Sequence, residues 1–179
     1  DDKFVPGLRQ LFETIHREGP RVAIQLMHPG LLIVAGGLLA PGVSVRVPSI
    51  TSWMPGHLPL GEVAEADIEG YVEDYAEAAR RAAEAGADAV ELHACHGCLV
   101  GAFMTPVMNK RNDGYGGSRE NRMRFALRIM ERIRQKLGED YPVIVRLSAA
   151  DDFPGGITID EAKYQAAAFE EAGADAIHV

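Results

Sequence analysis

The stretch EAGADAVELHACHG, residues 84–97, decides the fold, and a second copy of its first half, EAGADAI, occupies residues 171–177. Both copies have the pattern of a helix end, a glycine that stops the helix, and the start of a buried strand. Two weaker versions, REGPRVAIQL (17–26) and KLGEDYPVIVRL (136–147), follow the same order. A helix followed by a strand therefore occurs four times, which predicts βα units and a parallel sheet.

Three of the predicted strands carry polar side chains on one face only. Side chains alternate between the two faces of a strand, so VAIQLM (22–27), AVELHA (89–94) and VIVRLS (143–148) each have one aliphatic face. An open doubly wound sheet is covered by helices on both sides and needs two apolar faces. The pattern therefore favours a TIM (β/α)8 barrel, in which polar strand ends meet at one rim, the usual place for chemistry. The polar positions near that rim are Gln25, Glu91, His93 and Arg146.

The predicted helices have recognisable ends. The first begins near Pro6 and the second runs from about residue 66 to residue 85. The third starts after Ser118 as N-cap, and the fourth opens with a capping box from Thr158 to Glu161. The apolar stripe of the first helix would comprise Leu8, Leu11, Phe12 and Ile15.

The visible elements make up only part of a barrel. A complete TIM barrel needs eight strands in about 250 residues, and four strands are recognisable in these 179 residues. We therefore expect residues 1–179 to be the central part of one α/β barrel domain, an incomplete segment of about four βα units. The segment from Leu31 to Glu65 interrupts the pattern, is rich in Gly and Pro, and contains Trp53. It is either a loop that covers the barrel rim or an active-site lid.

Composition excludes several classes of protein. Hydrophobic residues at 47% and charged residues at 25% are typical of globular proteins. A net charge of -8 without a basic run argues against nucleic acid or an anionic membrane as partner. No apolar stretch approaches the ~20 residues of a membrane span, and Asp1–Lys3 lead directly into a helical pattern without a signal peptide. A cytoplasmic protein is therefore expected.

Two histidines and two cysteines lie within six positions at the end of the second strand. They are His93, Cys95, His96 and Cys98, and groups of these types can ligate zinc, with His28 as a further candidate. One strand-to-loop segment cannot easily turn all four inward, so we predict no metal ligand here, although a metal-binding barrel stays open. A redox dithiol of Cys95 and Cys98 also stays open, but it would normally open a helix, and none is evident here.

The order and spacing of five segments resemble those of the Old Yellow Enzyme family of FMN-dependent oxidoreductases. The similarity covers nearly the whole chain and leans toward the bacterial enoate and 2,4-dienoyl-CoA reductase branch. The most specific segment is RNDGYGGSRENRMRF, and the resemblance implies that its residues from Arg111 to Arg124 are mainly architectural rather than catalytic. The segments are QLMHPG (25–30), VELHACHG (90–97), RNDGYGGSRENRMRF (111–125), VIVRLSAADDFPGG (143–156) and AGADAIHV (172–179).

The resemblance implies a TIM barrel with FMN at the carboxyl ends of the strands. Gln25 would hydrogen-bond the flavin, and Arg146 would stabilise the negative charge of the reduced flavin. His93 and His96 would bind the carbonyl oxygen of an α,β-unsaturated substrate, and NADH or NADPH would supply the electrons. Two structural alternatives remain: Gln25 is a satisfied buried amide, and Arg146 forms an ion pair with Glu91.

The chain departs from the family at two positions. Cys98 stands where many members carry the Tyr that protonates the substrate's α-carbon, so it is a candidate proton donor. A thiol is a stronger acid than a phenol, but its side chain is shorter by a ring. Leu31 stands where many members carry an Arg.

Other outcomes are compatible with the resemblance. The family includes amine dehydrogenases and demethylases, and this chain could also be a truncated, non-catalytic barrel. Some relatives continue into an iron–sulfur cluster and a second flavin domain, which would lie outside this chain. A homo-oligomeric assembly stays open.

Overall fold

Four parallel strands form the main sheet of the protein, for which a computed structural model describes residues 1–35 and 40–179. The strands pair in the order β1-β4-β5-β6, which is also their order along the chain. A doubly wound sheet would reverse its strand order at a switch point, so the sequential order confirms the partial barrel. The strands are β1 (Ala23–Leu26), β4 (Ala89–Ala94), β5 (Val143–Leu147) and β6 (Ala176–His178).

Each strand of the main sheet follows a helix, as the fourfold pattern predicted. These helices are α1 (Val5–His16), α3 (Ile68–Ala85), α5 (Arg119–Leu137) and α6 (Ile159–Glu171). The remaining elements are short: the 3-10 turns η1 (Asp2–Phe4) and η2 (Glu65–Asp67), the helices α2 (Leu32–Ala35) and α4 (Leu99–Met104), and the strands β2 (Val45–Val47) and β3 (Leu60–Glu62).

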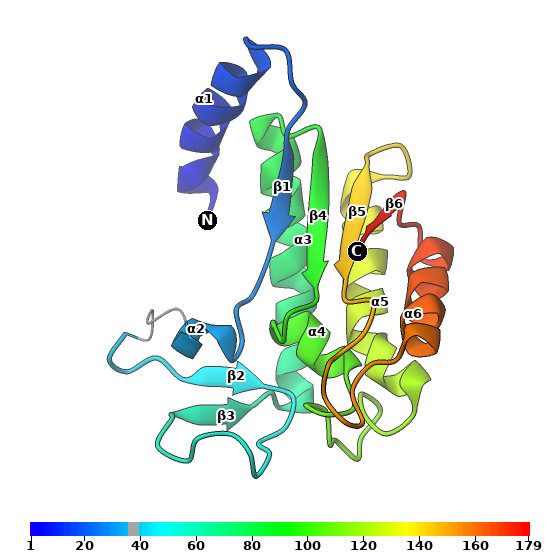
Figure 1. Ribbon diagram of the computed structural model, residues 1–179. Helices are drawn as coiled ribbons and strands as arrows, with labels where there is room; N and C mark the ends of the chain where they lie inside the picture. Colours follow the sequence, from blue (N-terminus) through cyan, green and yellow to red (C-terminus); the bar gives the residue numbers. More distant parts are fainter. Residues whose placement is uncertain (36–39) are drawn as a thin grey trace.

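The core lies between one face of the sheet and the helices α3 and α5, which stand behind the strands in Figure 1. Burying aliphatic side chains here stabilises the fold by about 1.5–3 kcal/mol for each large one. Among the described residues no helix covers the opposite face of β1, β4, β5 and β6, and this face carries the predicted polar side chains, of which Gln25 is exposed and His93 is buried. The strand side chains buried in the core are Leu26, Val90, Leu92, Ala94, Val143, Val145 and Leu147.

The helix ends form largely as their sequences predict. Gly86 ends α3 in the left-handed conformation with a φ of 99°, which glycine adopts without a steric penalty. Ser118 caps α5 by accepting a hydrogen bond from the Asn121 N–H. The prediction was wrong at Leu11, which is 53% exposed, so the buried stripe of α1 is narrower than its sequence suggested.

The predicted capping box at α6 is only half formed. The Thr158 hydroxyl accepts from the Glu161 N–H, but the Glu161 carboxylate does not return to Thr158. It pairs instead with Arg122, a buried guanidinium that also donates to the carbonyl oxygens of Met104 and Gly117. A buried charge without a partner is costly, so this ion pair takes precedence over the second half of the box.

The segment from Leu31 to Glu65 is more ordered than its sequence suggested. Its strands β2 and β3 form a separate parallel pair, seen below the main sheet in Figure 1. Val45, Val47 and Met54 pack with Ala102 of α4 and with Met108, so this segment has a small core of its own. It therefore packs as a cover beside the carboxyl ends of the strands. Residues 36–39 lie outside the described residues.

The loop between α4 and α5 is held by backbone-directed hydrogen bonds. The buried Asn109 amide donates to the carbonyl oxygens of Phe103 and Tyr115. Asp113 pairs with Arg111 and accepts from the Tyr115 N–H at 3.0 Å. These contacts support the architectural role expected for this segment.

No helix in the described part of the chain is long and apolar enough to cross a membrane.

Candidate active site

A row of polar side chains crosses the uncovered face of the sheet. Gln25 and Glu91 are register partners on neighbouring strands, and the Gln25 Nε2 donates to Glu91 Oε1 at 2.5 Å. His178 of β6 reaches the other carboxylate oxygen, with 2.9 Å between its Nδ1 and Glu91 Oε2. Partial burial acts to raise the pKa of Glu91, but the bonds from His178 and Gln25 outweigh it and leave the pKa below its usual value.

Arg146 lies beside this row but outside its hydrogen bonds. It is the register partner of His93 on one side and of His178 on the other. Within residues 1–35 and 40–179, the Glu91 carboxylate pairs with His178 and forms no ion pair with Arg146. The alternative in which Arg146 serves as the ion-pair partner of Glu91 is therefore wrong for these residues. His178 itself was missed from the sequence, although its alternation with Ile177 repeats the pattern of the other strands.

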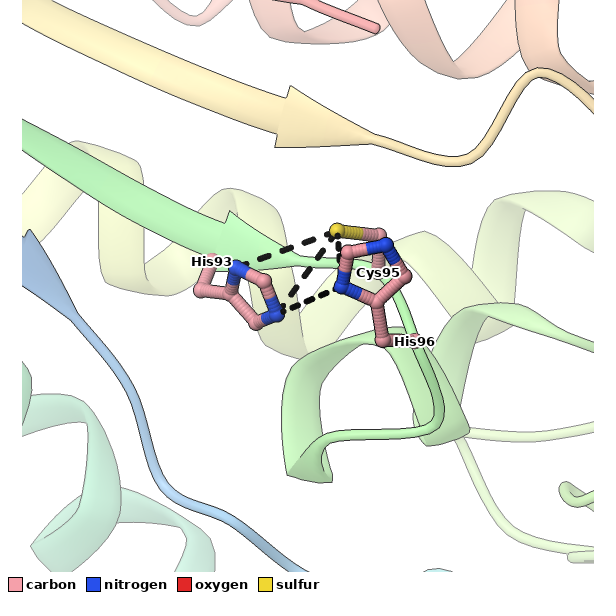
Figure 2. Close-up of side chains that lie close together, drawn as sticks. All are labelled: His93, Cys95 and His96. Atoms are coloured by element: carbon pink, nitrogen blue, oxygen red, sulfur yellow. Dashed lines mark hydrogen bonds between the residues drawn. The ribbon is translucent and has the colours of Figure 1, made fainter. Parts of the chain in front are cut away.

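Three of the four candidate ligands after β4 converge, as Figure 2 shows. His93 Nε2 lies 3.2 Å from His96 Nδ1. Cys95 Sγ lies 3.7 Å from His93 Nε2 and 3.5 Å from His96 Nδ1. We call His93, Cys95 and His96 the His–Cys cluster. His93 and Cys95 are buried, whereas His96 is exposed.

The backbone of the loop after β4 brings the cluster together. His96 has a φ of 56°, and it is the one non-glycine residue with a positive φ in the described part of the chain. This left-handed conformation is uncommon for a residue with a side chain and turns the His96 ring back over the strand end. The Cys98 N–H donates to the Cys95 carbonyl oxygen at 3.1 Å, which closes the turn.

Burial sets the protonation of the two buried members of the cluster. It lowers the pKa of His93, and the neighbouring His96 and Arg146 add to this effect. Burial also raises the pKa of the Cys95 thiol to about 11. Near neutral pH, His93 is therefore a neutral imidazole and Cys95 a neutral thiol.

A cavity of about 750 Å³ adjoins the cluster. Cys95 and His96 line one side of it, Trp53 of the covering segment contributes another part, and the loop after β5 contributes Asp151–Phe153. Asp151 is held in this wall because its carboxylate accepts from the Thr105 hydroxyl at 2.8 Å. This wall was not predicted from the sequence, although Asp151 and Asp152 follow the carboxyl end of a predicted strand, where barrels place functional groups.

Cys98 and His28 lie apart from the cluster. Cys98 is fully buried as the N-cap of α4, it does not line the cavity, and burial raises the pKa of its thiol. Its role as proton donor stays a prediction. The expectation that no helix follows the cysteines was wrong, since α4 begins at Leu99. His28 Nδ1 accepts from the Gly30 N–H at 3.1 Å and so supports the turn after β1.

Comparison with known proteins places these features in a family. The chain is 41% identical over its whole length to an NADH oxidase of Thermoanaerobacter brockii, of which it spans 27%. It is 37% identical, over 99% of its length, to an NADPH dehydrogenase of a Geobacillus species, of which it spans 50%. The chain thus spans between about a quarter and a half of these curated relatives.

Solved structures agree with the sequence relatives. A 2-naphthoyl-CoA reductase in complex with 2-naphthoyl-CoA superposes on 99% of the chain with a TM-score of 0.86 and 30% identity, and the match covers 29% of that protein. The family model for the NADH:flavin oxidoreductase / NADH oxidase family matches residues 1–179. These findings confirm the resemblance to Old Yellow Enzymes, and the chain belongs to the NADH:flavin oxidoreductase / NADH oxidase family.

Proposed function

We propose that the protein containing this chain is an FMN-dependent ene-reductase. It would use NADH or NADPH to reduce the C=C bond of an α,β-unsaturated carbonyl compound, such as an enone, enoate or enoyl thioester. The observation that carries the proposal is the pairing of His93 with His96 at 3.2 Å, at the carboxyl end of the strand next to Arg146, where His96 lines a cavity of about 750 Å³.

The residues of the uncovered face suit a flavin. Gln25 keeps an amide oxygen and one amide hydrogen beyond its bond to Glu91, which matches a ring edge that both donates and accepts hydrogen bonds. Within the described residues, no side-chain hydrogen bond or ion pair engages the Arg146 guanidinium, so this cation is available to an anionic group. We propose that Gln25 and Arg146 hold the FMN, Arg146 beside the negative charge of its reduced form.

The two histidines would activate the substrate. An imidazole N–H that donates to the carbonyl oxygen draws electron density from the conjugated C=C bond and stabilises the enolate-like transition state. FMN, when bound, supplies the hydride that it accepts from NADH or NADPH, and this hydride goes to the β-carbon. The α-carbon then takes a proton, which balances the reduction. Cys98 is the proposed donor of that proton, with water as the alternative because the thiol is buried away from the cavity.

The test is to replace both histidines in the full-length protein. His93→Ala/His96→Ala should slow enone reduction by at least about 100-fold, the cost of one lost oxyanion donor, while flavin stays bound. The rate is measured as reoxidation of the anaerobically reduced flavin by a panel of enones, enoates and enoyl thioesters. His57→Ala is the matched control, because His57 is an exposed histidine outside the cavity wall.

Three results would contradict the proposal. Unchanged turnover in the double variant would remove the assigned role of His93 and His96. Reduction of the wild-type flavin by an amine, without reoxidation by any unsaturated carbonyl compound, would favour the dehydrogenase activity that also occurs in the family. A full-length protein that retains no flavin would favour a non-catalytic barrel.

A further inference from the structure

The His–Cys cluster has the dimensions of a tetrahedral metal site. Its three donor atoms, His93 Nε2, His96 Nδ1 and Cys95 Sγ, are separated by 3.2, 3.5 and 3.7 Å. Zinc binds nitrogen at about 2.0–2.1 Å and sulfur at about 2.3 Å. At tetrahedral angles these bonds place two nitrogens about 3.3–3.4 Å apart and a nitrogen about 3.6 Å from a sulfur. One zinc ion therefore fits within bonding distance of all three atoms.

We propose that His93, Cys95 and His96 bind one Zn²⁺ ion, with the fourth coordination position open to the cavity. Two imidazole nitrogens and a thiolate suit a borderline-soft ion such as zinc and exclude calcium and magnesium, which prefer oxygen. Binding forms two Zn–N bonds and one Zn–S bond, and the Cys95 proton passes to solvent. Water from the cavity completes the tetrahedron.

The site is shaped by the fold before any ion binds. Cys95 is held on both sides: its carbonyl oxygen accepts from the Cys98 N–H, and Gly101 of α4 packs directly against its backbone. A side chain at Gly101 would come within 3.0 Å of three backbone atoms of Cys95. His93 is fixed as the penultimate residue of β4. Two rings have to turn on binding: the His96 ring, which is exposed, and the His93 ring, because Cys95 Sγ lies 3.8 and 3.7 Å from its two nitrogens and so faces the ring rather than the Nε2 lone pair.

The surroundings indicate an exchangeable ion rather than a structural one. Structural zinc sites have four protein ligands, whereas sites with three ligands and an open position hold a water or a substrate. Zinc-bound histidines usually donate their second ring N–H to a carboxylate or carbonyl group, which strengthens binding. In the described residues, the second ring nitrogens of His93 and His96 have no such partner, and His93 Nδ1 faces only Cys95 Sγ.

Zinc would compete with the substrate. The ion would be held by His93 Nε2 and His96 Nδ1, the ring nitrogens that face each other and that both histidines would use to donate to one carbonyl oxygen. A bound ion occupies their lone pairs and leaves no N–H directed at the oxygen. We therefore expect micromolar-range or tighter Zn²⁺ to inhibit reduction competitively with the carbonyl substrate, an effect that rests on the proposed function. Binding of the ion does not rest on it.

The experiment uses cobalt as a visible substitute for zinc in the full-length protein. After chelation and buffer exchange, Co²⁺ is added, and the absorption spectrum and the bound metal per chain are measured. We expect one ion per cluster, a thiolate-to-cobalt charge-transfer band, and the strong visible bands of tetrahedral cobalt, all displaced by Zn²⁺. Flavin absorbance is subtracted with the metal-free protein as reference.

Two cysteine variants form a matched pair. Cys95→Ser should lose the charge-transfer band, whereas Cys98→Ser should keep it, because Cys98 is buried outside the cluster. His96→Ala should weaken cobalt binding at least tenfold. An absent charge-transfer band in the wild type, or an equal loss in both cysteine variants, would overturn the site. Enone reduction by the metal-free enzyme is measured separately, so failure of the proposed function and failure of the zinc site are distinguishable.

Discussion

The two ends of the main sheet use charged and polar groups in opposite ways. At the amino ends of the strands, the repeated motif places Asp88 and Asp175 in equivalent positions. The Asp88 carboxylate accepts the Val22 N–H at 2.8 Å, and the Asp175 carboxylate accepts the Val143 N–H at 2.7 Å. Each aspartate also pairs with an arginine, Arg21 in the first copy and Arg134 in the second.

At the carboxyl ends the copies differ. After Asp88 the chain continues into the His–Cys cluster, whereas Asp175 is followed by a strand in which His178 bonds to Glu91. At the amino ends of the strands, the repeated aspartates thus hold the backbone of the neighbouring strand. At the carboxyl ends, which line the cavity, the two copies have different sequences. The difference is that expected of a barrel, where the amino end serves stability and the carboxyl end chemistry.

The largest expected effect on stability comes from the core between the two ends. Leu92 is fully buried next to His93 but on the opposite face of β4. Leu92→Ala should lower the free energy of unfolding by about 2–5 kcal/mol, because it removes buried surface and leaves a cavity. Urea unfolding measures the change. Leu11→Ala, at an exposed leucine, is the control and should change stability by less than about 0.5 kcal/mol.

A smaller effect is expected where α4 presses on the cluster loop. Gly101→Ala should cost about 1–3 kcal/mol, because the added Cβ would overlap the Cys95 backbone. It should also slow enone reduction by displacing His96. Gly70→Ala is the matched control, since a Cβ at this helical glycine meets nothing within 4 Å. That variant should gain about 0.5–1 kcal/mol. Equal stability of the two variants would show that the carboxyl end is not tightly packed.

The smallest expected effect concerns the amino end. Asp88→Asn keeps an oxygen for the Val22 N–H but removes the charge that pairs with Arg21 and His16. Stability should fall, and enone reduction per folded molecule should stay unchanged. The midpoint of urea unfolding at pH 7 tests the first expectation. If Asp88→Asn lost activity without losing stability, the amino ends of the strands would not serve stability alone.

The pH dependence gives a second check on Asp88. The Val22 N–H, Arg21 and His16 hold the pKa of this carboxyl below its usual value. A depressed pKa stabilises the fold above the unfolded value of about 3.9, and this contribution is lost as the pH falls through the folded value. The difference in unfolding midpoint between the wild type and Asp88→Asn should therefore shrink from pH 7 to about pH 3. A constant difference would contradict the assigned ion pairs.

Local patterns predicted most of the secondary structure. The four βα units, the caps at Ser118 and Thr158 and the stop at Gly86 all depend on residues close in sequence. The errors came from distant partners. Glu161 pairs with Arg122 rather than completing its capping box, and the covering segment forms two short strands because α4 provides an apolar surface for it.

The candidate site was predictable only in part. The sequence predicted that Gln25, His93 and Arg146 lie on one face of the sheet. This prediction is possible without a structure, because side chains alternate between the two faces along every strand. The cavity wall at Asp151 and Trp53 was not predictable, because it joins segments about a hundred residues apart. Nor did the spacing of the histidines and cysteines reveal which of them would meet.

The sequence by itself determined the parallel order of the strands, the two chemically different faces of the sheet and the family, because each depends on local periodicity or on a contiguous motif. Only the tertiary structure decided that His96 turns back to Cys95 and His93 while Cys98 turns into the core. The physical reason is that a left-handed residue and the close packing of Gly101 set the direction of these side chains, and neither can be derived from spacing alone.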